Sequence, residues 1–243
     1  MNIVITGASG GIGFQTAIYL ASKSKNHIFA ISRDKKGLGK LQTQFDMLKE
    51  KGRLTIIVGD VSNKDFLIEL KGEISKLTNS LQAIINNAGM LYYKPFEELT
   101  DKEWENMYNV NLFSPVRLIK ALLPLLKLSE EMLNTKFRAH IVNIGSIGGV
   151  MGSVKFSGLS AYSSSKGALS ILSECLAEEF EPLGISVNCL SLGSVETEMF
   201  RKAFPGIKAS MGPEQMGHYI GDFTESGFCF FNGKVLPVSI STP

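Results

Sequence analysis

The chain has 243 residues, of which 44% are hydrophobic and 20% charged, as expected for a globular protein with a substantial core. Its formal net charge of +2 gives no reason to expect a nucleic acid or an anionic membrane as partner. No apolar run reaches the roughly 18–20 residues that span a bilayer. We expect no signal peptide either, because a strand is predicted from Ile3, directly after the start.

The cysteines and histidines are few and widely spaced. They are Cys175, Cys189 and Cys229, and His27, His140 and His218. This spacing predicts neither a disulfide framework nor a metal site. Reduced thiols are typical of the cytoplasm, which is the location we expect.

Short apolar runs alternate with amphipathic segments of helical length. The runs predict strands over 3–6, 28–32, 54–58, 83–86, 139–144, 186–190 and 234–238, and the segments predict helices over 12–24, 34–51, 63–78, 101–127, 160–181 and 213–221. The first six strands are apolar throughout, as in parallel strands buried on both faces. The predicted fold is therefore one α/β domain over residues 1–243. It is a Rossmann-like, doubly wound parallel sheet in the order 3-2-1-4-5-6-7, with helices on both faces.

A glycine-rich loop joins the first strand to the first helix. It contains Gly7, Ser9, Gly10, Gly11, Ile12 and Gly13. Glycines allow a sharp turn and let backbone N–H groups approach a phosphate, while the helix N-terminus favours negative charge. The position between strand and helix indicates a dinucleotide site.

Two alternatives exist for this loop. It is a plain tight turn, or it is the G-x-S-x-G elbow of a hydrolase with Ser9 as nucleophile. The elbow requires a later acidic residue and a histidine. His218 is available in the sequence, but no neighbouring residue indicates a site around it.

The second strand ends in Ser32-Arg33-Asp34, where the dinucleotide motif places the residue that reads the ribose. Arg33 after the small Ser32 suits a 2′-phosphate, which predicts NADP(H) over NAD(H). The alternative for Arg33 is a solvated loop charge. For Asp34 we favour the N-cap of the next helix.

Tyr162 and Lys166 are four residues apart on a predicted helix, so they lie on one face. A phenol has a pKa near ~10, and a nearby cation stabilises its charged form. The pair is suited to general acid/base chemistry, although an isolated pair of this kind is usually a surface feature.

Together with the glycine loop, the pair resembles the short-chain dehydrogenase/reductase family over essentially the whole chain. The other matching motifs, in order, are Asp60-Val61, Asn86-Asn87-Ala88-Gly89, Asn111, Ser146, and Gly193, Val195 and Thr197 after the sixth strand. The resemblance implies that Asp60 and Val61 contact the adenine and that Asn87, Ala88 and Gly89 line the cofactor. Leu192 replaces the family's usual proline, and we expect a less rigid loop there.

The resemblance also implies a mechanism for reversible hydride transfer between a nicotinamide and a carbonyl or alcohol carbon. Tyr162 is the acid/base and Ser146 binds the substrate oxygen. Lys166 binds the ribose and lowers the tyrosine pKa, and Asn111 holds a relay water. A dinucleotide-binding regulator or scaffold that has lost turnover is the alternative. The intact set of four residues argues against it.

The substrate and the assembly are less directly specified. A short lid is expected over 193–212. Apolar residues flank the site segments at Met90-Leu91-Tyr92-Tyr93, Val150-Met151 and Met199-Phe200, and such residues are usually core. If they line the pocket, the substrate is a small, mainly apolar molecule. Trp104 is expected to pack in the interior. Helix 160–181 carries more apolar surface than one stripe, so we expect a homodimer or homotetramer through helices 101–127 and 160–181. The alternative is that loop 145–158 covers the excess.

Overall fold

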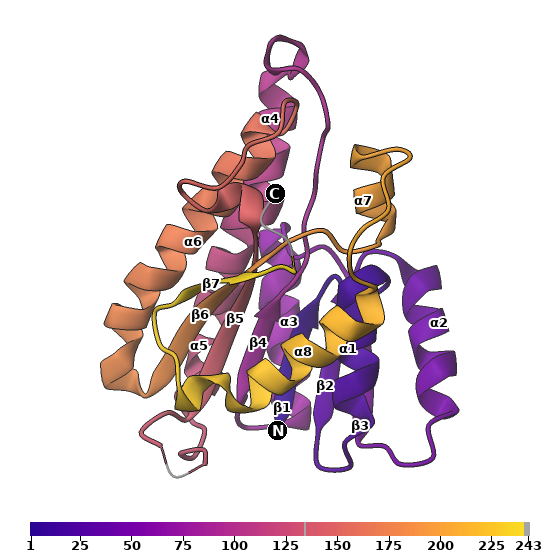
Figure 1. Cartoon of the computed structure of the whole chain (residues 1–243). Helices are drawn as coiled ribbons and strands as arrows, with labels where there is room; N and C mark the ends of the chain where they lie inside the picture. Colours follow the sequence, from indigo (N-terminus) through magenta and orange to yellow (C-terminus); the bar gives the residue numbers. More distant parts are fainter. Residues whose placement is uncertain (134, 241–243) are drawn as a thin grey trace.

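Seven parallel strands form one twisted sheet at the centre of the molecule (Figure 1). The computed structural model describes residues 1–133 and 135–240. The strands are β1 (Asn2–Thr6), β2 (His27–Ser32), β3 (Arg53–Val58), β4 (Ala83–Asn86), β5 (Ala139–Ser146), β6 (Ile185–Leu192) and β7 (Val235–Val238). Their order, β3-β2-β1-β4-β5-β6-β7, confirms the predicted fold.

Helices cover both faces of the sheet (Figure 1). They are α1 (Gly11–Ala21), α2 (Lys35–Asp46), α3 (Lys64–Leu77), α4 (Asp101–Tyr108), α5 (Ser114–Leu126), α6 (Ser160–Phe180), α7 (Glu198–Ala203) and α8 (Pro213–Ser226). Alternate strand residues point to opposite faces. Ile3 and Ile5 therefore join the core beneath α1, α2 and α8, whereas Val4 joins the core beneath α3, α5 and α6.

The chain order places a crevice in the middle of the sheet. The chain moves outward from β1 to β3 and then returns to β4 on the other side of β1. The loops after β1 and β4 therefore leave the sheet in opposite directions at its carboxyl edge. Ligands of open α/β sheets bind at such a switch point.

The predicted helix 101–127 is interrupted, which corrects the sequence-based boundary. Asn109–Phe113 forms a turn of π-helix between α4 and α5. The Ser114 N–H bonds the Asn109 carbonyl five residues back, and Pro115 has no N–H to continue the α-helical pattern. Such π turns are frequent at functional sites, and this one contains Asn111.

Other boundaries differ by a few residues. The helix predicted over 34–51 ends at Asp46, because residues 49–52 leave the helix and Gly52 bonds the Ala21 carbonyl at the end of α1. The last helix runs to Ser226 rather than 221, and β5 and β6 are each longer than predicted. Side-chain patterns locate an element better than they locate its ends.

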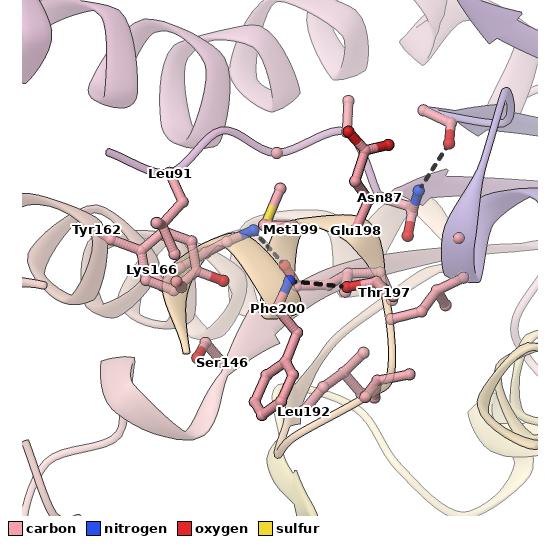
Figure 2. A pocket seen from close by; sticks show the side chains of 18 of the residues that line it. Asn87, Leu91, Ser146, Tyr162, Lys166, Leu192, Thr197, Glu198, Met199 and Phe200 are labelled. Carbon is pink, nitrogen blue, oxygen red and sulfur yellow. Dashed lines mark hydrogen bonds between the residues drawn. The ribbon is translucent and has the colours of Figure 1, made fainter. Parts of the chain in front are cut away.

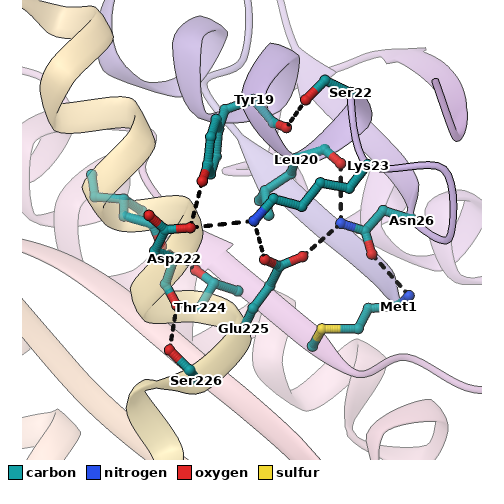
Figure 3. Close-up of polar contacts among 11 residues, drawn as sticks. Met1, Tyr19, Leu20, Ser22, Lys23, Asn26, Asp222, Thr224, Glu225 and Ser226 are labelled. Carbon is teal, nitrogen blue, oxygen red and sulfur yellow. Dashed lines mark hydrogen bonds and ion pairs between the residues drawn. The ribbon is translucent and has the colours of Figure 1, made fainter. Parts of the chain in front are cut away.

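Polar contacts fasten α8 to α1 far from the crevice (Figure 3). Lys23 at the end of α1 pairs with Glu225, and with Asp222 at 3.2 Å. The Tyr19 hydroxyl donates to Asp222 at 2.5 Å, and Asn26 donates to Glu225 at 2.9 Å. These contacts hold the segment that follows the predicted lid against the first helix.

Candidate active site

A cavity of about 840 Å³ opens at the carboxyl edge of the sheet. Nearly all of the predicted site residues line it. They are Gly7, Ser9, Gly10, Gly11, Ile12, Ser32, Arg33, Asp60, Val61, Asn87, Ala88, Gly89, Ser146, Tyr162, Lys166, Gly193, Val195 and Thr197. The predicted site residues that do not line it are Gly13 and Asn111, and each supports residues that do.

The glycine loop leaves the start of α1 open toward this cavity. Gly7 and Gly11 adopt positive φ angles of 69° and 56°, which favour glycine. A Cβ on Gly10 would meet nothing within 4 Å, and no acidic residue stands in the first turn of α1. The exposed N–H groups and the positive end of the helix dipole suit a pyrophosphate.

Asn87 ties the glycine loop to the end of β4. Its Nδ2 donates to the Thr6 carbonyl at 2.9 Å and the Gly7 carbonyl at 3.3 Å. A Cβ on Gly13 would lie 2.3 Å from that same nitrogen, so only glycine fits there. Gly13 therefore acts through packing, as its position in the motif predicts.

Ser32, Arg33 and Asp60 form the far end of the cavity. The Ser32 hydroxyl donates to Ser9 Oγ at 2.8 Å, and Arg33 Nη1 lies 3.4 Å from Asp60 Oδ2. Burial alone would raise the pKa of Asp60, but hydrogen bonds from Ser62 and the Arg33 charge hold that pKa below its usual value. Asp34 caps α2 by accepting from Gly37 N, which confirms its expected role, although it also lines the cavity.

Tyr162 and Ser146 meet at the opposite end, beside Lys166 (Figure 2). Ser146 ends β5, and Tyr162 lies in the first turn of α6. Burial raises the pKa of Tyr162, and a hydrogen bond with Ser146 opposes part of that rise. With its pKa raised, the phenol is protonated at neutral pH.

Lys166 is buried and points to the backbone of β5. Its Nζ donates to the Ile144 carbonyl at 2.7 Å. Burial lowers the pKa of Lys166 to about 8, and Cys189 nearby opposes that shift. Gly89 lies beside the ammonium group, since a Cβ on it would be in ordinary contact with Nζ at 3.7 Å.

The Asn111 side chain forms hydrogen bonds with other groups of the protein. Its Oδ1 accepts from Met90 N at 2.8 Å, and its Nδ2 donates to the Met90 carbonyl at 2.9 Å and to Ser165 Oγ at 3.0 Å. The side chain thus fixes the loop after Gly89 against α6. A relay water at this position would have to bind a main-chain group of the π turn instead.

A second set of buried amides joins the three elements that carry the site. Asn86 on β4 donates to Asn143 on β5 at 2.7 Å, and Asn143 donates to Ser173 on α6 at 2.9 Å. All three side chains are buried. This chain of bonds fixes β4, β5 and α6 relative to one another beneath Ser146 and Tyr162.

The predicted lid, residues 193–212, is a loop closed at its base. Glu196 N donates to the Met211 carbonyl at 2.8 Å, and Ala209 N donates to the Glu196 carboxylate at 2.9 Å. Its one helix, α7, is capped by Thr197, whose hydroxyl accepts from Phe200 N (Figure 2). The lid is therefore short, as expected, and anchored at both ends.

Leu192 is held by strand pairing, which offsets the loss of the proline. It pairs with Ser146 on β5 and with Val238 on β7, and its side chain is buried. Gly193 N then donates to the Val238 carbonyl at 2.9 Å. Strand pairing therefore positions the backbone at Leu192 and Gly193 without the proline.

The substrate side of the cavity contains residues that the sequence did not identify. Leu91, Met199 and Phe200 line it, as considered from the sequence, and Phe156, Leu159 and Phe204 join them. Phe200 and Phe204 are four residues apart at α7, a spacing that could have indicated a shared face. Trp104 packs with Met107 and Leu99 away from this cavity, as expected.

The alternative of a hydrolase elbow finds no support. The Ser9 hydroxyl bonds Ser32, and His218 stacks on Tyr19 with ring centroids 4.4 Å apart. Among residues 1–133 and 135–240, no group of three His, Cys, Asp or Glu side chains is placed to hold a metal. Within the same residues no helix is long and apolar enough to cross a membrane.

Comparisons with known proteins agree with this geometry. The family model described as short chain dehydrogenase matches residues 1–208. The benzil reductase ((S)-benzoin forming) of Saccharomyces cerevisiae is 33% identical over 223 residues, 88% of this chain and 77% of that protein. A cyclopentanol dehydrogenase of Comamonas sp. is 25% identical over 88% of this chain and 82% of its own length. The Pseudomonas aeruginosa RhlG/NADP active-site complex superposes with a TM-score of 0.84 at 26% identity, covering 98% of this chain and 94% of that one.

Proposed function

Because the chain belongs to the short-chain dehydrogenase/reductase family, we propose that it uses NADP(H) to reduce the carbonyl group of a small, mainly apolar substrate. The observation that carries the proposal is one cavity that joins the open N-terminus of α1 to the Tyr162–Ser146 pair and Lys166. A phosphate-binding end and a proton-donating end in one cavity are what such a reaction requires.

The cavity fits a dinucleotide along its whole length. Gly10 and Gly11 would bind the pyrophosphate through backbone N–H groups, and Asp60 and Val61 would flank the adenine. Lys166 would bind the nicotinamide ribose, with Val195 and Thr197 beside the carboxamide. Gly7 and Gly13, whose Cβ atoms would collide with Asn87, let the glycine loop pack against the end of β4, and a Cβ on Gly10 would meet nothing within 4 Å.

Arg33 supports the preference for NADP(H). It lines the cavity beside Ser9 and Ser32, its side chain is 63% exposed, and its 3.4 Å pairing with Asp60 is long for a charge-assisted bond. A 2′-phosphate would give the guanidinium a doubly charged partner. Breaking the contact with Asp60 would cost little, because exposed ion pairs are weak. Asp34, which would repel that phosphate, is engaged in capping α2.

The residues divide the remaining chemistry among them. When bound, the cofactor supplies the hydride. Tyr162 donates a proton to the carbonyl oxygen, and Ser146 hydrogen-bonds the same oxygen where negative charge develops. The Lys166 ammonium stabilises the tyrosinate left behind. Burial raises the pKa of Tyr162, so its hydroxyl holds the proton that it would donate.

The substrate class follows from the apolar lining near Tyr162. Leu91, Leu159, Met199 and Phe200 leave few polar partners beyond Ser146 and Tyr162 themselves. Two relatives are named for benzil and cyclopentanol, an uncharged diketone and an uncharged alcohol. The same chemistry in this chain would suit an uncharged ketone.

The test is consumption of NADPH or NADH with a panel of uncharged ketones and diketones, including benzil and cyclopentanone. We expect turnover with NADPH in preference to NADH. A dinucleotide-binding regulator is the second candidate, and it would bind NADPH without consuming it on any member of the panel. Turnover that prefers NADH would reject the cofactor part of the proposal alone.

A further inference from the structure

Four aromatic rings gather at the substrate end of the cavity, and we refer to Tyr93, Phe156, Phe200 and Phe204 as the aromatic wall. They come from three separate segments: the loop after β4, the loop before α6, and α7 with the residue that follows it. Phe156, Phe200 and Phe204 line the same cavity as Tyr162. Of these four residues, only Phe200 contributes to the function proposed above, as part of the apolar lining.

Phe204 is the centre of the aromatic wall. Its ring centroid lies 5.2 Å from that of Phe200, 5.5 Å from that of Phe156 and 6.1 Å from that of Tyr93. The Phe156 and Phe204 rings meet edge to face, with 74° between their planes. This arrangement is the one that aromatic quadrupoles favour, and it leaves other ring edges and faces open.

The wall is incompletely covered. Phe156 remains 41% exposed and Tyr93 50% exposed although both touch Phe204. Large rings that pack together but stay half open have apolar surface available for another group. Because Phe156 lines the same cavity as Tyr162, a substrate is the nearest candidate to cover its open surface.

The lid holds the wall in a fixed position. Glu196 accepts from Ala209 N and pairs with Arg201 at 3.0 Å, which braces α7 from both sides. Two charged lid residues also line the cavity, Glu198 and Lys208, and Glu198 pairs with Lys202. A braced wall of rings selects for a flat apolar group rather than a polar one.

We propose that the aromatic wall makes this enzyme selective for ketones that carry an aromatic ring next to the reacting carbonyl, with Phe204 as the principal specificity-determining residue. The proposal rests on the reductase function proposed above and specifies its substrate class. A substrate ring would extend the wall by the same edge-to-face contacts while its carbonyl reaches Tyr162. A saturated ring of equal carbon number would fill similar space without those contacts.

The experiment compares two ketones with the same carbon skeleton, acetophenone and cyclohexyl methyl ketone, in parent, Phe204→Leu and Phe230→Leu enzymes with NADPH. Leucine keeps an apolar side chain and removes the ring. Phe230 is 79% exposed and does not line the cavity, so its variant is the matched control. We expect the ratio of kcat/KM values, aryl over cyclohexyl, to fall about tenfold in Phe204→Leu, mainly through KM, and to stay unchanged in Phe230→Leu.

The outcomes separate this proposal from the one on which it rests. An unchanged ratio in folded Phe204→Leu enzyme, shown to bind NADPH like the parent, would overturn the role of the wall. If Phe204→Leu does not fold, Phe156→Leu applies the same test at the exposed side of the wall. Equal parent activity on both ketones would also overturn it, whereas no turnover of any carbonyl compound would reject the reductase function itself.

Discussion

Asn111 and Met90 are joined by two hydrogen bonds, with the Met90 N–H donating to Oδ1 at 2.8 Å and Nδ2 donating to the Met90 carbonyl at 2.9 Å. The Asn111 amide thereby satisfies the backbone N–H and carbonyl of Met90, as a neighbouring strand would, in the loop that follows β4. It connects the cofactor segment at Gly89 to the π turn and, through Ser165, to the helix of Tyr162. The Asn111 side chain is buried, so if it were removed, water could not reach the groups that it hydrogen-bonds.

Asn111→Ala is expected to destabilise the fold by about 2–4 kcal/mol, because it leaves several buried polar groups without partners. Ser165→Ala removes one bond of the same set and should cost only about 1 kcal/mol. Urea unfolding of both variants measures the difference. If Asn111→Ala were no less stable than Ser165→Ala, the two hydrogen bonds between Asn111 and Met90 would contribute nothing to stability.

Tyr162→Phe should leave folding and NADPH binding close to those of the parent. The change removes one hydroxyl, which hydrogen-bonds Ser146. Turnover should fall by roughly 10²–10⁴-fold, the usual value of general acid/base catalysis. Single-turnover reduction with saturating NADPH gives the rate, and fluorescence titration gives cofactor affinity. Near-parent turnover would mean that another group supplies the proton.

The sequence predicted most of the residues that line the candidate site, because they lie in short local patterns. The glycine loop and the Tyr162–Lys166 pair each depend on spacing within one turn or one helix. The aromatic wall could not be found in this way, since Tyr93 and Phe204 are distant in the chain and meet only through the fold. The π turn was also missed, because one extra residue in a helix hardly changes its apolar period.

Arg33→Ala should weaken NADPH binding about tenfold or more and leave NADH binding nearly unchanged. The guanidinium is expected to leave its exposed contact with Asp60 and pair with the 2′-phosphate, which NADH lacks. Lys40→Ala, also on the surface but outside the cavity, controls for a general change of charge. Dissociation constants for both cofactors decide the matter. Equal affinities in the parent would reject the assigned preference for NADP(H).

We expect His140 to make the fold sensitive to acid. The ring is fully buried between β5 and α8, with Nδ1 bonded to the Thr224 carbonyl at 3.1 Å and Nε2 to Asn188 at 3.1 Å. Burial lowers the pKa of His140 from 6.5 to about 4, although the Thr224 carbonyl opposes the shift. Between these two values the unfolded chain binds a proton that the folded chain does not, so stability falls as the pH falls.

The free energy of unfolding should fall by about 3 kcal/mol between neutral pH and about pH 4 as a result of His140 protonation in the unfolded chain. His140→Gln should be less stable at neutral pH but lose less on acidification than the parent does. His218→Gln, at an exposed position, should follow the parent curve. Unfolding in denaturant at several pH values measures all three. A pH dependence in His140→Gln equal to the parent's would assign the acid sensitivity to other groups.

The outer face of α6 leads to a prediction about assembly. Ile171 is 58% exposed and Cys175 is exposed, one turn apart on a helix whose other face packs on the sheet. Phe113, in the π turn before α5, is 46% exposed. The loop before α6 leaves this surface open, since Ile171 and Cys175 are exposed in its presence. It packs near the start of the helix, where a Cβ on Gly149 would lie 2.7 Å from Gly167 N.

A two-fold axis would cover the face with the same helix of a second copy, so we expect a mass of two or four times 26.5 kDa in light scattering at micromolar concentration. Ile171→Glu would place a charge opposite its own symmetry mate and should shift the mass toward that of one chain. Ile68→Glu is the control, because Ile68 is 73% exposed on α3, outside the predicted interface. If the parent itself scatters as a single chain, the apolar face of α6 remains open to solvent and the dimer or tetramer is rejected. If the parent is an oligomer that Ile171→Glu leaves intact, the interface lies on another face.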